Sequence, residues 1–467
     1  MTTPLHFMTI TELAPLLAAK KLSPVEVTRA LLERIDRLDG RYRSYATRMD
    51  DEALAAARDA EREIMAGRHR GPLHGVPIAV KDLCFTKGVR TMGGCKVLAD
   101  FVPDADGTVV ARLRAAGAVL LGKLNLTEGA MGGYHPDFAI PRNPWDAARW
   151  TGSSSSGSGV AVAAGLCFAA LGSDTGGSIR FPAACCGTVG LKPTWGRVSR
   201  HGVLVLAESM DHVGPLTRSV ADAGIVLQAI AGSDPLDPTT LQEPVPDMLA
   251  GIERGVRGLR IGYDPNHPAD VDAEVAAAVD AGVQVLGALG AEIVEVALPD
   301  IDSLVDAWPV LCTAEAVLAH AATYPSRRDE YGEWFRSWLD IGASLSGADY
   351  ARANLLRLEC NARLRAVLAD IDVLACPTMP MPAFPVSDEA LYGPIADIGA
   401  SGLQRYAVPT NYNGAPTLPL PCGFTRAGLP IGMQLVGKHL AEPLLVQVGS
   451  AYERATEWHE RRPVIDG

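Results

Sequence analysis

The chain alternates between stretches with helical spacing of apolar residues and short apolar runs. Helical spacing predicts helices over residues 9–21, 24–38 and 51–65 near the N-terminus, and further along at 106–116, 271–289, 350–369 and 442–454. Short apolar runs are typical of buried strands, and they occur at 76–80, 118–123, 259–263, 292–296, 373–378 and 428–437. This alternation of strands and helices predicts a layered α/β fold.

One stretch departs from this pattern, between residues 152 and 193. A Ser/Gly loop at 152–159 leads into a segment of small apolar residues at 160–171, and a second loop rich in glycine and hydroxyls follows at 172–178. The apolar segment is shorter than the roughly 20 residues that span a bilayer, and we expect it to form a buried helix. Loops tied to the ends of one packed element can hold a nucleophile and its oxyanion donors at fixed distances.

The second loop has the composition of a catalytic turn. Its adjacent glycines, Gly176 and Gly177, permit positive φ angles and a close approach to a ligand. Successive amide groups in such a turn can converge on one anionic oxygen, and Ser178 at its end is a candidate nucleophile. A flexible Ser/Gly linker is the alternative, but linkers stay polar, whereas this loop adjoins an apolar segment and is followed by Arg180, Phe181 and Pro182.

Composition and net charge make some classes of partner and some cellular locations less favourable. The 467 residues have a formal net charge of −12, which disfavours nucleic acid and anionic membranes as partners. No run reaches transmembrane length, and the N-terminus lacks the pattern of a secretory signal. The nine cysteines are odd in number and form no Cys-x-x-Cys pair, so we expect free thiols and a cytoplasmic location. Vicinal Cys185 and Cys186 have no neighbour at ligand spacing, so no metal site is predicted.

The stretch from Gly172 to Ala183 resembles the signature of the amidase signature family of serine amidases. That family has an upstream Ser/Gly loop, matched here with Ser153 and Ser156 at positions where it usually has glycine. It also has a Gly-Val-Pro-Ile-x-Val-Lys-Asp motif, matched by residues 75–82. The resemblance covers most of the chain and implies a large central mixed β-sheet sandwiched between layers of α-helices.

The resemblance also implies a single amidase domain over residues 1–467. It would comprise an N-terminal helical layer at 1–70, a catalytic core at 71–240, a variable substrate-side region at 241–400, and C-terminal strands and a helix at 401–467. Aromatic residues concentrate between 308 and 338, either as a wall of the substrate site or as packed core, and we favour the core.

The matching positions assign catalytic roles by resemblance. Lys81 is the base, Ser178 is the nucleophile, and Ser154 relays the proton between them. A lysine must be neutral to act as a base, and burial can lower its pKa from about 10.4 by up to ~3–5 pH units. The remaining predicted site residues are the oxyanion amides of Thr175, Gly176, Gly177 and Ser178, the supporting side chains of Ser155, Asp174 and Arg180, and the pocket residues Met131, Gly132, Tyr134 and His135.

The predicted function is hydrolysis of carboxamide C–N bonds, and of esters too, through a serine acyl-enzyme that needs no metal or organic cofactor. The expected partner is a small amide, ester or carbamate, with no nucleic acid or membrane partner, and the expected state is a monomer or homodimer. Three alternatives stay open: a carbamate, urethane or urea-type hydrolase on the same triad, the glutaminase-type subunit of a tRNA-dependent amidotransferase, and a non-catalytic binding protein. The glutaminase class carries an acidic residue where this chain has Gln404 and Arg405.

Overall fold

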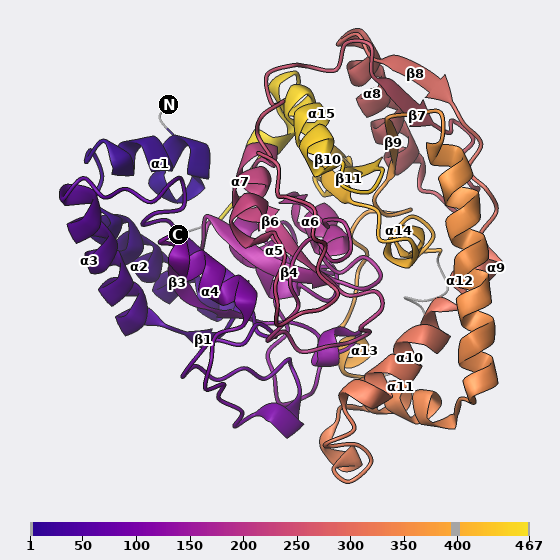
Figure 1. Ribbon diagram of the computed structural model, residues 1–467, viewed down its shortest axis with the longest axis horizontal. Helices are drawn as coiled ribbons and strands as arrows, with labels where there is room; N and C mark the ends of the chain where they lie inside the picture. Colours follow the sequence, from indigo (N-terminus) through magenta and orange to yellow (C-terminus); the bar gives the residue numbers. More distant parts are fainter. Residues whose placement is uncertain (1–2, 394–401, 466–467) are drawn as a thin grey trace.

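The computed structural model of the protein describes residues 3–393 and 402–465, and it contains two mixed β-sheets with helices around them (Figure 1). The first sheet has six strands in the order β1-β3-β2-β4-β6-β5. Strand β2 pairs in parallel with β3 and with β4, and the other pairings are antiparallel. The strands are β1 (Tyr45–Arg48), β2 (Pro77–Lys81), β3 (Val119–Leu124), β4 (Ala169–Asp174), β5 (Val189–Gly190) and β6 (His212–Thr217).

The second sheet has five strands in the order β10-β11-β9-β7-β8. Its members are β7 (Arg260–Tyr263), β8 (Glu292–Glu295), β9 (Val373–Pro377), β10 (Thr417–Phe424) and β11 (Pro430–Gly437). Lys192, just after β5, and Thr417 exchange two backbone hydrogen bonds of 2.9 Å, which join the two sheets at their edges. The predicted α/β fold with a central mixed sheet is therefore confirmed, with the sheet formed from two parts that meet at this bridge.

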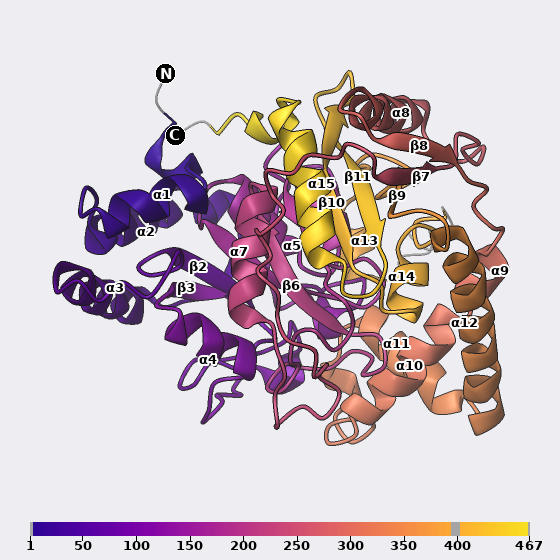
Figure 2. The same ribbon diagram turned by 45° about the horizontal axis from the view of Figure 1, so that its top comes forward.

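Helices flank the sheets on both sides. The predicted N-terminal helices are present as α1 (Ile10–Ala18), α2 (Pro24–Tyr42) and α3 (Asp50–Met65), and Figure 1 shows them at the opposite side of the molecule from α8 and α12. Figure 2 shows α7 and α15 side by side in front of the strands. Further helices around the sheets are α4 (Thr108–Ala115), α7 (Val220–Ile230), α8 (Ala273–Ala288), α12 (Gly347–Leu368) and α15 (Glu442–Arg454).

The prediction of one buried helix over residues 160–171 is wrong. Helix α5 (Ser156–Ala163) ends near Gly165, and the chain then enters β4. Gly165 has a φ of 66°, a left-handed conformation that favours glycine, and a Cβ there would lie 2.9 Å from the carbonyl oxygen of His6. Residues 169–171 then pair with β2 and β6 as a strand. Both halves are fully buried, and so periodicity could not distinguish them.

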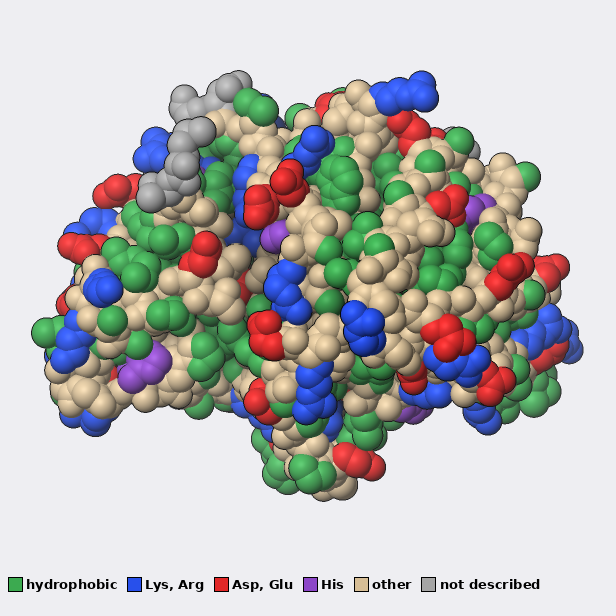
Figure 3. Space-filling view, turned by 90° about the horizontal axis from the view of Figure 1, so that it is seen from above, with side chains coloured by type: hydrophobic (Ala, Val, Ile, Leu, Met, Phe, Trp, Pro, Cys, Tyr) green, Lys and Arg blue, Asp and Glu red, His purple; other side chains and the backbone are tan. Residues whose placement is uncertain are grey.

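The surface is mixed in character. Acidic and basic side chains are interspersed with apolar ones over the face seen in Figure 3. Within the described ranges, no helix combines the length and apolar character needed to cross a bilayer. The nine cysteines are all buried and unpaired. The predicted boundary between residues 400 and 401 lies outside the described residues.

Candidate active site

Lys81 ends β2 in the middle of the first sheet and is completely buried. Its Nζ atom lies 2.6 Å from Ser154 Oγ, 3.0 Å from Ser155 Oγ and 2.9 Å from Ser173 Oγ. Burial lowers the pKa of Lys81 to about 7, and the nearby Cys84 and Asp174 oppose this shift only in part. The amine is therefore close to neutral at physiological pH, and it is surrounded by hydroxyls.

The loop before α5 brings the candidate relay serine to this amine. The peptide between Ser153 and Ser154 is cis. Ser155 Oγ bonds to both the amide and the carbonyl of Ser173 on β4, at 3.2 Å each, which attaches the loop to the sheet. The amide of Ser155 donates to the carbonyl oxygen of Ser178 at 3.2 Å, so this backbone contact brings the two Ser/Gly loops together.

Ser178 lies in the turn between β4 and α6 (Arg180–Cys186) and lines a cavity. Its side chain is nearly buried, and among the described residues its hydroxyl makes no side-chain hydrogen bond. Lys81 and Ser154 are thus in direct contact, and Ser178 is tied to the same loop through the backbone of Ser155. The hydroxyl of Ser178 is free to meet a substrate in the cavity.

The four amides predicted for an oxyanion hole are not equivalent. The amide of Gly177 donates to Asp174 Oδ1 at 2.9 Å and is therefore occupied. The amides of Thr175, Gly176 and Ser178 have no hydrogen-bond acceptor within the described part of the chain. The turn therefore offers three amides rather than four to an incoming anionic oxygen.

Asp174 and Arg180 form a fully buried ion pair beneath this turn, with Arg180 Nη2 at 2.8 Å from Asp174 Oδ1. Burial raises the pKa of the Asp174 carboxyl, but Arg180 outweighs this effect and holds the pKa well below its usual range. Arg180 also donates to Ala407, Thr410 and Asn411 around α14 (Val408–Tyr412). The ion pair thus connects the turn to a distant segment of the chain.

The cavity beside Ser178 has a volume of about 280 Å³. Met131 and Gly132 line it as predicted, whereas Tyr134 and His135 are not among its lining residues. Tyr134 is buried, and its hydroxyl bonds to Ser156 Oγ at 2.7 Å. The Nδ1 atom of His135 accepts a hydrogen bond from the amide of Asp137. These two side chains therefore lie outside the lining of this cavity, and their place in a substrate pocket stays a prediction.

The aromatic segment divides into wall and core. Trp308 on α10 (Trp308–Ala319) and both Trp334 and Trp338 on α11 (Glu333–Ser344) line the cavity. Tyr324, Tyr331 and Phe335 are buried in the core. The segment therefore contains both cavity-lining and core residues, and a role of the cavity-lining tryptophans in a substrate site stays a prediction.

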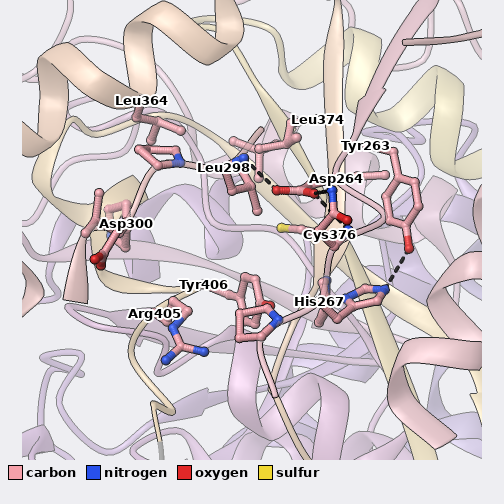
Figure 4. A pocket seen from close by; sticks show the side chains of 18 of the residues that line it. Tyr263, Asp264, His267, Leu298, Asp300, Leu364, Leu374, Cys376, Arg405 and Tyr406 are labelled. Carbon is pink, nitrogen blue, oxygen red and sulfur yellow. Dashed lines mark hydrogen bonds between the residues drawn. The ribbon is translucent and has the colours of Figure 1, made fainter. Parts of the chain in front are cut away.

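A larger cavity of about 370 Å³ lies at the carboxyl ends of β7 and β9 (Figure 4). Arg405, which lines it, bonds to Asp302 and Asp270 at 2.7 Å each. Tyr263 and His267 bond to each other, as Figure 4 shows. Serine and lysine are absent from its described lining residues, and so the candidate chemistry lies in the smaller cavity.

Several site residues were not predicted from the sequence. Ser173 contacts Lys81, Asn411 donates to the Asp174 carbonyl and carboxylate, and Asp211 accepts from Thr175 Oγ1 at 2.5 Å. Ser173 lies inside the signature stretch, and its place there could have marked it as a site residue. Asp211 stands in no recognisable motif. Over the described ranges, no group of three or more His, Cys, Asp or Glu side chains is placed to hold a metal ion.

Known proteins resemble this chain over nearly its whole length. The family model for amidases matches residues 26–446. The protein named "Putative amidase AmiD" from Mycobacterium tuberculosis (strain ATCC 25618 / H37Rv) is 46% identical over 98% of this chain and 96% of its own. A glutamyl-tRNA(Gln) amidotransferase subunit from Geobacter sp. (strain M21) is 41% identical over 97% of this chain and 98% of its own.

The solved structures agree with the sequence relatives. The native peptide amidase from Stenotrophomonas maltophilia superimposes with a TM-score of 0.87 at 33% identity, covering 99% of this chain and 100% of its own. The family model and these full-length similarities show that the chain belongs to the amidase family and is a hydrolase that acts on the C–N bonds of amides.

Proposed function

We propose that this amidase works through a serine acyl-enzyme in which Ser178 is the nucleophile, Ser154 relays the proton and Lys81 is the base. The observation that carries the proposal is a buried lysine with a pKa of about 7, held 2.6 Å from Ser154 Oγ next to the loop of Ser178. A serine hydroxyl is a weak nucleophile until a base removes its proton, and a neutral amine can serve as that base.

The reaction begins when Ser178 Oγ attacks the carbonyl carbon of the amide. As the new C–O bond forms, the proton of Ser178 passes through Ser154 to Lys81, and the carbonyl electron pair moves to oxygen. The resulting ammonium of Lys81 returns a proton through Ser154 to the leaving nitrogen, and the C–N bond breaks. Water, activated by the same relay, then hydrolyses the acyl-enzyme and regenerates Ser178.

The free amides of Thr175, Gly176 and Ser178 stabilise the anionic oxygen of the tetrahedral intermediate. Losing one such donor costs roughly 10²–10³-fold in turnover. The Gly177 amide has a different task, because its bond to Asp174 fixes the turn that presents the other three. Arg180 holds that carboxylate from the other side.

The cavity supports a small substrate with an apolar or aromatic acyl group. Its volume of about 280 Å³ admits a small molecule, and Trp308, Trp334 and Trp338 form much of its wall. Esters react by the same steps with an alcohol as the leaving group. Carbamates and urea-type substrates remain alternatives on the same triad, and parallel assays with matched aryl amides and aryl carbamates decide between them.

The test compares Ser178→Ala and Lys81→Ala with the control Ser158→Ala. Ser158 lies on α5, where its hydroxyl bonds to the carbonyl oxygen of Leu171, and it does not line the cavity. We expect the first two variants to lose hydrolysis of simple amides and p-nitrophenyl esters, and the control to retain it. A fluorophosphonate should label the wild type and not Ser178→Ala. Near-native turnover by Ser178→Ala would end the acyl-enzyme proposal.

The glutaminase alternative is less well supported by the cavity. At the place where the glutaminase class has its acidic residue, this chain has Gln404, which lines the cavity, and Arg405, which is paired with Asp302 and Asp270, and neither side chain is a carboxylate. The carboxylate among the described lining residues is Asp306, from a different segment. Release of ammonia from glutamine at a rate comparable to that from aryl amides would revive this alternative.

We propose further that the enzyme is cytoplasmic, acts as a monomer or homodimer, and has no nucleic acid partner. The nine unpaired cysteines support a reducing compartment, and the net charge of −12 opposes binding to nucleic acid. Size-exclusion chromatography with light scattering measures the oligomeric state, and a trimer or larger assembly would contradict it.

A further inference from the structure

The three free amides of the candidate oxyanion turn share one structural feature. Each amide N–H belongs to a peptide group whose carbonyl oxygen, at the other end, accepts a hydrogen bond. A bond to the carbonyl oxygen fixes the peptide plane, and it also polarises the group so that its N–H becomes a better donor. The residues that bond to these carbonyls therefore control the oxyanion donors without touching the substrate oxygen.

The peptide between Asp174 and Thr175 has two side-chain donors on its carbonyl. Asn411 Nδ2 donates to this oxygen at 3.1 Å. His212 Nδ1 lies at the same distance and shares its proton with the Met210 carbonyl oxygen, which is closer at 2.6 Å. The peptide between Gly177 and Ser178 is held by the amide of Phe181, which donates to the Gly177 carbonyl at 2.7 Å. These contacts come from within the signature stretch or from segments packed directly around the Asp174–Arg180 pair.

The peptide between Thr175 and Gly176 is held differently, by Trp308. The indole Nε1 of Trp308 donates to the Thr175 carbonyl oxygen at 3.0 Å. The indole also lies directly against Gly176, because a Cβ at that position would approach its Cζ2 atom to 2.6 Å and its Nε1 atom to 3.0 Å. Glycine at 176 thus allows the indole to sit at hydrogen-bonding distance from the peptide.

We infer that Trp308 is a positioning residue for the oxyanion hole, acting through the Thr175–Gly176 peptide to aim and polarise the Gly176 amide. The inference rests on the proposed acyl-enzyme mechanism and assigns a role to a residue from α10, outside the signature stretch. Thr175 is then fixed at two points, because its hydroxyl bonds to Asp211 and its carbonyl to Trp308.

The chain offers a matched control for this role. Trp338 lines the same cavity and packs against Trp308 with ring centroids 5.9 Å apart. Its Nε1 atom is buried but has no hydrogen-bond partner among the described residues. Replacing either tryptophan with phenylalanine shortens the aromatic wall, but only Trp308→Phe removes a hydrogen bond to the turn.

The first measurement is steady-state hydrolysis of an aryl amide by Trp308→Phe and Trp338→Phe. We expect kcat to fall about tenfold in Trp308→Phe with KM within about twofold of wild type, because the lost bond acts on the transition state. This loss is smaller than the cost of removing an oxyanion donor itself. Trp338→Phe should leave kcat within about twofold, and its effect on KM should match that of Trp308→Phe, because both substitutions shorten the same wall.

The second measurement uses an aryl trifluoromethyl ketone as a probe of the oxyanion site. Ser178 Oγ adds to the ketone carbon, the carbonyl electron pair moves to oxygen, and the proton passes through Ser154 to Lys81, giving an anionic adduct. We expect Trp308→Phe to weaken inhibition by this ketone about tenfold and to leave inhibition by the matching secondary alcohol, which forms no adduct and carries no anionic oxygen, nearly unchanged. A role confined to packing would weaken both inhibitors alike.

A third variant tests the same contact from the side of the turn, and as a single substitution it does not depend on the folding of Trp308→Phe. Gly176→Ala should displace the indole from the Thr175 carbonyl and lower kcat, and its effect should shrink in the Trp308→Phe background. Equal kcat values for Trp308→Phe and Trp338→Phe, with unchanged ketone affinity, would overturn the inference while leaving the acyl-enzyme intact. Activity retained by Ser178→Ala would instead overturn the proposed mechanism.

Discussion

The pKa of Lys81 makes a specific prediction for the pH dependence of acylation. The base must be neutral to accept the proton of Ser178, and burial brings its pKa down from 10.5 to about 7. Below that pH the amine is protonated and cannot act as a base. The rate constant kcat/KM for an amide should therefore fall on the acidic side and reach a plateau above pH 8.

The magnitude follows from the neutral fraction of the amine. With a pKa of about 7, roughly half of the enzyme is active at pH 7, about a tenth at pH 6 and about a hundredth at pH 5. An amine with an ordinary pKa of about 10.4 would be neutral in less than about 0.1% of molecules at pH 7. Burial therefore contributes about a thousandfold to the amount of active base at physiological pH.

The assay is kcat/KM for an uncharged aryl amide between pH 5 and 9 at constant ionic strength, because an uncharged substrate contributes no titration of its own. Five buried carboxyls of the described residues also have pKa values raised into this range, those of Asp82, Asp211, Asp222, Glu128 and Glu453, and two of them serve as controls. Burial raises the pKa of Asp211, next to Thr175, to about 6, and that of Glu128, which holds the amide of Gly332 before α11, to about 8. Asp211→Asn and Glu128→Gln separate their contributions, and the inflection near pH 7 should persist in both.

A flat profile from pH 5 to pH 8 would refute the assignment of Lys81 as the base. An inflection near pH 10 would show that the lysine is charged in the working enzyme, and it would refute the argument from burial. An inflection near 7 that disappears in Asp211→Asn would assign the titration to the carboxyl instead of the amine.

Two further predictions concern stability. The pKa of Lys81 is lower in the folded than in the unfolded protein, so a protonated Lys81 destabilises the fold in full below pH 7, and this cost disappears as the pH rises towards 10.5. Lys81→Met removes this cost but also removes three hydrogen bonds. The net result should be an unfolding free energy about 2 kcal/mol higher at pH 6, and this gain should vanish by pH 9. Urea denaturation at both pH values measures this, and a gain independent of pH would contradict it. Arg180→Lys should lower the unfolding free energy by about 3 kcal/mol, because a lysine cannot reproduce the hydrogen bonds of the guanidinium group to Asp174 and α14. The control is Arg149→Lys at a partly exposed ion pair with Asp146, which should lower it by under about 1 kcal/mol. Equal losses in the two variants would argue against a stabilising role of the buried pair.

Local signals predicted many of the elements well. Helix α15 spans the predicted residues 442–454, and β2 delivers Lys81 at its end as the apolar run before it indicated. These elements could be predicted because their signals lie within a few neighbouring residues: a regular spacing of apolar residues, or a change from apolar to charged residues. Residues 160–171 failed because both a buried helix and a buried strand present continuous small apolar side chains, and Gly165 was the sole local mark of the change.

The candidate site was predictable where its parts stand together in the sequence. Lys81, Ser154 and Ser178 were predicted because each belongs to a motif with a recognisable order, and the structure places Lys81 in contact with Ser154. The sequence of a loop does not fix which way its side chains turn, and the hydroxyl of Tyr134 bonds to Ser156 instead of lining the cavity beside Ser178.

Trp308 marks a limit of this kind of prediction. Trp308 is buried among aromatic residues, which indicates a core residue, and the same is true of Phe335 on the next helix. What distinguishes Trp308 is one buried N–H that requires an acceptor, and the acceptor is a carbonyl 133 positions earlier in the chain. Periodicity shows which residues turn inwards, but it does not show which distant peptide a buried donor will meet. Residues outside the motif that position a catalytic turn must therefore be found from the structure, by identifying the hydrogen-bond partner of each buried polar atom.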